Sequence, residues 1–119
     1  MLLRGYKNIL CCFLFLSLFS IKSFACAQAL PVDDPGFCQS FSDVARCYCQ
    51  SQGLPARMCA NVQLIYNRMI STFGSIDRAC RYQKENTYQN CLDDWQCFLH
   101  GGVLPDGRVC SGTGQACSF

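Results

Sequence analysis

The chain has 119 residues, enough for one small domain, and 12 of them are cysteines. This cysteine density is typical of a disulfide scaffold and argues against a fold that relies on a large hydrophobic core alone. The formal net charge is +2, but Arg4, Lys7 and Lys22 fall in the first 25 positions, so the rest carries seven basic and eight acidic residues. Such a domain lacks the basic surface that phosphate backbones require, and we expect no nucleic-acid partner.

Residues 1–25 have the pattern of a secretory signal peptide: a basic start, an apolar run over residues 9–21, and small residues after it. The apolar run of about 13 residues is shorter than the roughly 20 that cross a bilayer, so we expect it to be removed. Cleavage is expected after Ala25 or after Ala27. The first site leaves ten cysteines and the second leaves nine, and the even number favours Ala25.

Cys26 follows the favoured cleavage site and is a candidate for lipidation, as in a bacterial lipoprotein. Ala25 and Cys26 fit such a signal, whereas Ser23 and Phe24 replace the aliphatic and small residues that usually precede them. A lipid would attach the domain to a membrane face. We expect an exported protein of the periplasm, the outer membrane or the extracellular medium, with membrane contact only if Cys26 is lipidated.

The exported part begins with a polar segment, residues 26–36, in which Pro31 and Pro35 favour an extended chain. Residues 37–119 form the predicted disulfide-rich domain. Four helices are expected in it, over residues 37–52, 55–73, 75–86 and 87–101. Gly53 is the expected end of the first helix, and Ser75 is the expected N-cap of the third.

The second of these segments carries the clearest helical periodicity. Its apolar residues recur at steps of three and four and make one stripe, formed by Met58, Val62, Ile65, Met69 and Phe73. Pro55 suits the first turn of a helix, and Gly74 suits the position after its end. We therefore expect one amphipathic helix over residues 55–73 with this stripe facing the core.

The last segment, residues 103–119, differs in composition from the helical part. Pro105, Asp106 and Gly107 form a turn signal, because proline sets the first turn dihedral and glycine takes the left-handed one. We expect an irregular lobe or short hairpin held by Cys110 and Cys117. The predicted fold is mainly α, a small disulfide-stabilised bundle of about four short helices with an irregular C-terminal lobe.

Ten cysteines are candidates for disulfide bonds: Cys26, Cys38, Cys47, Cys49, Cys59, Cys80, Cys91, Cys97, Cys110 and Cys117. Two pairs flank predicted turns at similar distances and should meet when the helices pack antiparallel, namely Cys49 with Cys59 and Cys80 with Cys91. The pairing of the other six stays open, because sequence alone does not fix connectivity.

A metal site is the alternative role for these cysteines. Cys47 and Cys49 resemble a fragment of a thiolate cluster, but the paired Cys-x₂-Cys pattern of zinc sites does not occur, and oxidising compartments remove free thiolates. The chain has no Cys-x-x-Cys redox motif either. We therefore expect no metal and no other cofactor.

Catalytic residues are also not evident. His100 is the only histidine and has no recognisable nucleophile to serve, so we expect it to be a cation near a helix end. Adjacent Asp93 and Asp94 would point about 100° apart on a helix, which suits a solvated face better than a shared ligand. Trp95 is expected in the core. Four tyrosines could form a contact surface, namely Tyr48, Tyr66, Tyr82 and Tyr88. The sequence predicts a protein that is not an enzyme.

The stretch from Cys91 to Cys97, followed by Gly101-Gly102 and by Cys110-Ser-Gly-Thr-Gly, resembles small cysteine-rich exported proteins of intracellular gammaproteobacterial pathogens. Some of those are secreted effectors, and others are accessory subunits of the type IVB secretion system. The resemblance implies a non-enzymatic role in the cell envelope or outside the cell. We expect a bacterial cell-envelope component that binds protein partners, such as an accessory subunit of a secretion assembly. The alternative is a secreted effector or inhibitor-type binding module that acts on a host or extracellular target.

Overall fold

The computed structural model describes residues 26–119, and the predicted signal peptide lies outside the described residues. Its four α-helices are α2 (Phe37–Ser51), α3 (Val62–Phe73), α4 (Ile76–Tyr82) and α5 (Tyr88–His100). Two 3₁₀ turns complete the described part, η1 (Ala56–Cys59) and η2 (Cys110–Gly112). The prediction of a small, mainly helical, disulfide-rich fold is confirmed.

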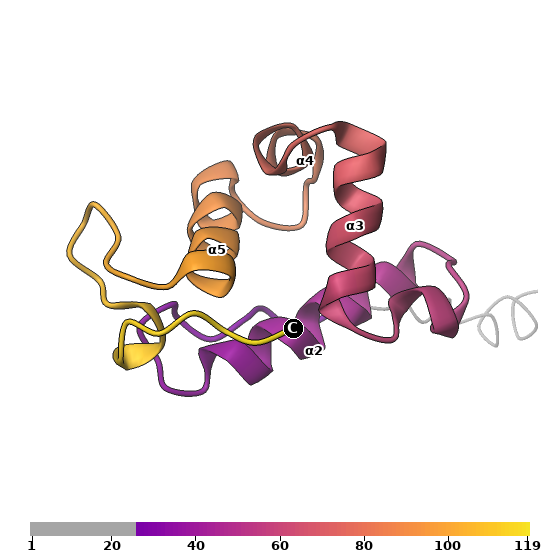
Figure 1. Cartoon of the computed structure of the whole chain (residues 1–119). Coiled ribbons are helices and arrows are strands. Elements are labelled where there is room, and N and C mark those ends of the chain that lie inside the picture. Colours follow the sequence, from indigo (N-terminus) through magenta and orange to yellow (C-terminus); the bar gives the residue numbers. More distant parts are fainter. Residues whose placement is uncertain (1–25) are drawn as a thin grey trace, which may run out of the picture.

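The four helices contact one another in a ring. In Figure 1, α2 lies along one side, α3 rises from its end, α4 crosses above, and α5 descends beside them. The C-terminal segment then runs back along α2. Because α5 contacts α2, the first and last helices close the ring.

The predicted single helix over residues 55–73 is wrong, because the structure divides it in two. Residues 56–59 form the short turn η1, and α3 starts only at Val62. Asn61 separates them with an extended backbone, and its side chain accepts a hydrogen bond from the Leu64 amide at 3.0 Å. This N-cap satisfies a free helical N–H group and fixes the start of α3.

The expected N-cap at Ser75 is confirmed, since its hydroxyl accepts a hydrogen bond from the Arg78 amide at 3.2 Å. Helix α4 is shorter than predicted and ends at Tyr82. Gln83 is extended, and its side-chain amide donates to the Asn86 carbonyl at 2.7 Å. The segment after Tyr82 is therefore a hydrogen-bonded loop instead of a helical turn.

Aromatic rings form the centre of the core, where α2 meets α5. The Phe41 ring lies 4.9 Å from Trp95 and 4.9 Å from Phe98, measured between centroids, and 5.6 Å from Phe37. Trp95 is only 7% exposed, as expected for a core residue. These contacts fix the register of the two helices, since edge-to-face and offset ring pairs constrain geometry as well as burying area.

The segment before α2 is part of the core, which differs from the extended lead-in that was predicted. Val32 is 2% exposed, and its carbonyl accepts a hydrogen bond from the Ser111 amide. Leu30 donates its amide to the Ser40 hydroxyl at 2.8 Å. Residues 32–36 form turns that bring the chain back onto α2.

The C-terminal lobe is irregular, as predicted, and contains one antiparallel bridge between Val103 and Val109. The turn between them is closed by a hydrogen bond from the Gly107 amide to the Leu104 carbonyl at 2.9 Å. Gly107 has a φ of +92°, the left-handed conformation expected of a glycine in this turn. Leu104 is buried and anchors the hairpin to the core.

Candidate functional site

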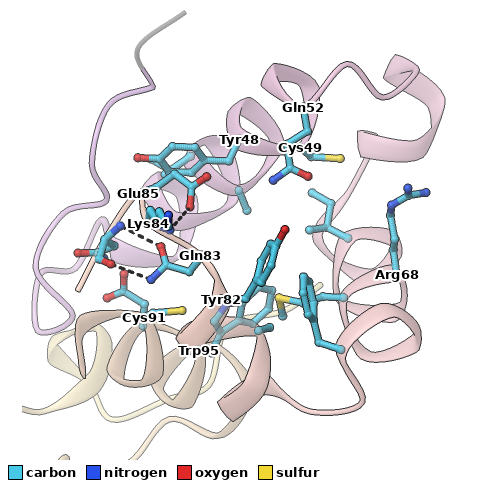
Figure 2. A pocket seen from close by; sticks show the side chains of 18 of the residues that line it. Tyr48, Cys49, Gln52, Arg68, Tyr82, Gln83, Lys84, Glu85, Cys91 and Trp95 are labelled. Carbon is cyan, nitrogen blue, oxygen red and sulfur yellow. Dashed lines mark hydrogen bonds between the residues drawn. The ribbon is translucent and has the colours of Figure 1, made fainter. Parts of the chain in front are cut away.

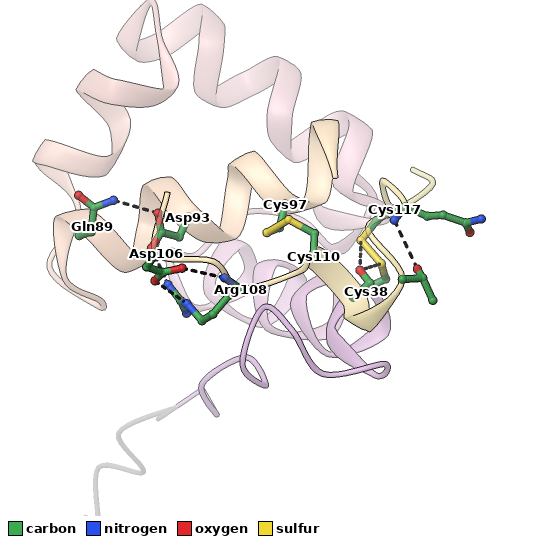
Figure 3. The surroundings of a disulfide bond; sticks show 11 residues. Cys38, Gln89, Asp93, Cys97, Asp106, Arg108, Cys110 and Cys117 are labelled. Atoms are coloured by element: carbon green, nitrogen blue, oxygen red, sulfur yellow. Dashed lines mark hydrogen bonds and ion pairs between the residues drawn. A yellow bond between two sulfur atoms is a disulfide. The ribbon is translucent and has the colours of Figure 1, made fainter. Parts of the chain in front are cut away.

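Five disulfides join all ten candidate cysteines, in the pairs Cys26–Cys47, Cys38–Cys117, Cys49–Cys59, Cys80–Cys91 and Cys97–Cys110. The second and fifth are visible in Figure 3. The structure thus joins both pairs that the turn spacing favours, and it resolves the other six cysteines into three further bridges. These cysteines serve the scaffold, and five bridges indicate an oxidising, exported environment.

The bond between Cys26 and Cys47 bears on the predicted lipidation and on the two predicted cleavage sites. A sulfur atom in a disulfide cannot also carry a thioether-linked lipid, so this bridge and lipidation of Cys26 exclude each other. Cleavage after Ala27 would remove Cys26 and leave Cys47 without its partner. Within residues 26–119, no helix has the length and apolar character needed to span a bilayer.

The expectation of a solvated Asp93 and Asp94 is wrong. The Asp93 side chain is 13% exposed and accepts hydrogen bonds from Arg108 Nη2 and from Gln89 Nε2, both at 2.9 Å (Figure 3). Arg108 lies on the C-terminal hairpin and also pairs with Asp106. The sequence hides this contact, because 15 residues separate Asp93 from Arg108 and only the tertiary fold brings them together.

Asp94 is half-buried on α5 and has no hydrogen-bond partner among the described residues. The pKa of its carboxyl is raised to about 7, chiefly by burial and next by the charge of Asp93, while the charge of Arg108 acts in the opposite direction. Asp94 is therefore the one acidic side chain of the described part whose pKa is raised into the neutral range.

Asp94 lines a groove of about 860 Å³ that lies inside the ring of helices. Side chains from α2, α3, α4 and α5 and from the loop before α5 form its walls (Figure 2). This volume falls in the range of ligand-binding clefts. The groove is the main candidate functional site of the described residues.

The apolar stripe of α3 forms one wall of the groove, and it is less buried than predicted. Val62 is buried, but Ile65, Met69 and Phe73 are only half-buried and face the groove. Helix α3 is also free of cysteine, so no disulfide reaches it. Non-covalent packing alone holds this wall against α2 and α4.

Aromatic side chains line the rest of the groove. Tyr48 comes from α2, Tyr82 from α4 and Trp95 from α5 (Figure 2). Tyr82 is 72% exposed, and its ring lies 5.0 Å from the Phe73 ring. Two tyrosines expected to form a contact surface, Tyr48 and Tyr82, therefore meet at this groove. The sequence predicts that these tyrosines suit a contact surface, but it does not predict that they line the same groove.

The single histidine lies elsewhere. His100 is exposed in the last turn of α5 and is not part of the groove lining. The groove thus combines apolar, aromatic and charged side chains suited to binding. No family model, curated protein or solved structure matches this chain with significant similarity.

Proposed function

We propose that this chain is an exported, non-catalytic interaction protein, which uses the groove inside its helical ring to hold a segment of a partner protein. The observation that carries this proposal is the half-buried stripe of Ile65, Met69 and Phe73 on α3. A helix of a small domain normally buries its apolar face against its own core. Here residues 26–119 cover the stripe only in part, and a partner would complete its burial.

A scaffold role is consistent with the distribution of the bridges. The disulfides tether α2, α4, α5 and the C-terminal tail. The groove lies between three of these elements, α2, α4 and α5, and the disulfide-free helix α3. A rigid frame lowers the entropy cost of binding, because fewer groups have to be ordered when the partner arrives.

The cell envelope of a bacterium is the setting we favour, with a role as accessory subunit of a secretion assembly. The cysteine-rich stretch between Cys91 and Cys97 supports this setting through its resemblance to exported proteins of that kind. The five bridges support export through their requirement for an oxidising compartment.

A secreted effector or inhibitor-type binding module is the second candidate. The Cys26–Cys47 bridge favours it specifically, because that bond leaves no sulfur for a lipid anchor at Cys26. Recovery of the free protein from culture medium would support this candidate, and co-purification with envelope complexes would support the first.

Site-specific photo-crosslinking in the producing cell tests the proposed function. A crosslinking amino acid at Tyr82, on the groove, should yield a discrete adduct with an envelope or extracellular protein. The same amino acid at Gln96, which is exposed on α5 and does not line the groove, is the matched control. Equal adducts from both positions, or none from Tyr82, would contradict the proposal.

A further inference from the structure

The charged side chains of the groove differ in how much water they keep. Arg68, Arg81, Lys84 and Glu85 line the groove but are exposed, so water can solvate their charges. Arg81 is also held by Asp77 at 2.9 Å and stacks on the Tyr88 ring at 5.1 Å from its centroid. These charged groups therefore contribute little to which charge a bound ligand should carry.

Asp94 is the exception among the charged lining residues. Its carboxyl is half-buried and accepts no hydrogen bond from any residue between 26 and 119. A desolvated carboxylate without a partner is unfavourable, and a cation placed next to it would restore the lost interaction. Asp94 therefore favours a ligand with a positively charged group inside the groove.

The aromatic lining favours the same kind of ligand. Trp95 follows Asp94 on α5, and Tyr48 and Tyr82 line the groove from α2 and α4 (Figure 2). Aromatic ring faces attract ammonium and guanidinium groups, most strongly where water is excluded. A groove that contains both a carboxyl group and aromatic rings is a suitable environment for a lysine or arginine side chain.

The apolar stripe of α3 indicates which residues of the ligand lie around its positively charged group. The half-buried stripe runs from Ile65 through Met69 to Phe73, a rise of about 12 Å along the helix axis. Two turns of an amphipathic helix have this length and would match the stripe with apolar side chains at helical spacing. An occupant that fits both features is a peptide segment with one basic residue among apolar ones.

We propose that the groove binds an amphipathic segment of a partner protein, whose apolar residues cover Ile65, Met69 and Phe73 and whose lysine or arginine side chain inserts toward Asp94. This inference rests on the proposed function and deepens it by naming the chemistry of the partner.

Two synthetic peptides test the inference on the oxidised, exported protein. One is an amphipathic helix of leucine and lysine, and the other has glutamate in place of each lysine. Trp95 is the only tryptophan of the chain and lines the groove, so its fluorescence reports binding directly. At about pH 8, where most of the Asp94 carboxyl is ionised, we expect the lysine peptide to bind about tenfold tighter than the glutamate peptide or more.

The variant Asp94→Asn should weaken the lysine peptide about tenfold and leave the glutamate peptide unaffected. Asp33→Asn, which changes an exposed acid outside the groove, is the matched control and should bind as the unaltered protein does. Far-ultraviolet circular dichroism of each variant shows that the fold is retained.

Three results would overturn the inference. Equal binding of both peptides would leave the groove as a docking site and remove its preference for a cation, so the proposed function would survive. An unchanged affinity of Asp94→Asn would remove the role of this carboxyl. Binding of phosphatidylglycerol vesicles in place of either peptide would assign the groove to an anionic lipid surface through Arg68 and Lys84.

Discussion

The side chains of Asp93, Asp94 and Arg108 form a small electrostatic unit at the junction of α5 and the C-terminal hairpin. Arg108 neutralises Asp93 by direct contact at 2.9 Å and acts on Asp94 only through its charge. The two adjacent aspartates therefore differ in environment: Asp93 is hydrogen-bonded to a guanidinium group, whereas Asp94 has no such partner and the pKa of its carboxyl is raised to about 7. Burial is the main cause of the shift at Asp94.

Asp94 should make the stability of the domain depend on pH. The pKa of its carboxyl is about 7 in the folded chain and about 3.8 in the unfolded chain, so the folded state binds the extra proton between these values. The free energy of unfolding therefore falls as pH rises from about 4 to about 7. Asp94→Asn should remove this fall and stabilise the domain at about pH 8 by roughly 1–3 kcal/mol, measured by urea unfolding.

The same titration on Asp33→Asn serves as the control, because that exposed acid lies outside the groove. Its pH profile should follow that of the unaltered protein. A pH profile of Asp94→Asn that also follows the unaltered protein would show that burial of this carboxyl costs little.

Arg108 should contribute more to stability than a fully exposed arginine. Arg108→Met removes the charged donor from Asp93, whose side chain is 13% exposed, and should lower the free energy of unfolding by about 1–3 kcal/mol. It should also raise the pKa of Asp94 further, because the opposing charge is lost. Arg81→Met, which breaks the exposed pair with Asp77, is the comparison and should change stability little. Equal losses in the two variants would contradict this assignment.

At the level of elements, the end of α5 depends on a glycine that no other residue can replace. Gly101 has a φ of +65°, and a Cβ atom there would lie 2.5 Å from both the Ala116 amide nitrogen and the Gly114 carbonyl oxygen. Gly102 has a similar φ of +83°, but a Cβ atom would meet no atom within 4 Å. The C-terminal tail fills the space where a side chain at Gly101 would lie. It also accepts a backbone hydrogen bond from Gly102 through the Gly114 carbonyl, but leaves space for a side chain there.

These neighbouring glycines form a matched pair for mutation. Gly102→Ala should cost about 1 kcal/mol, the penalty for a left-handed alanine. Gly101→Ala adds a backbone clash to that penalty and should cost about 3 kcal/mol or more. Urea unfolding with the disulfides intact measures both. Similar losses in the two variants would show that the tail does not pack against α5 as described.

The element boundaries show which sequence signals were sufficient. Ser75 starts α4 as its side-chain chemistry predicts, since the cap depends only on residues within one turn. The break at Asn61 was missed because the apolar periodicity continues through it, from Met58 in η1 to Val62 in α3. Periodicity reports which residues face inward, and a cap within the stripe leaves that pattern unchanged.

Long-range contacts could not be predicted from the sequence, for a different reason. The groove depends on the angle between α3 and the other helices, and the contact of Asp93 with Arg108 depends on the hairpin that follows α5. Neither is encoded in local spacing. The disulfide pairs divide in the same way: the bridges that flank predicted turns could be inferred from spacing, whereas Cys38–Cys117, with a sequence separation of 79, could not.

For the molecule as a whole, the Cys38–Cys117 bridge closes the longest loop and should stabilise the fold most through chain entropy. Three short bridges lie inside this loop, and Cys26–Cys47 crosses it. The double variant Cys38→Ala/Cys117→Ala should lose about 4 kcal/mol of stability, measured by thermal or urea unfolding. For a domain of this size, that is a large part of the total. A loss below about 1 kcal/mol would mean that packing of the tail suffices without the bond.

The most direct test of the central claim, that five disulfides hold these helices outside the reducing cytosol, is the intact mass of the naturally exported protein after alkylation, with and without prior reduction. We expect a chain that begins at Cys26, carries no lipid, takes up no alkyl group before reduction and takes up ten after it. A folded product whose thiols are mostly alkylated without reduction would contradict the account.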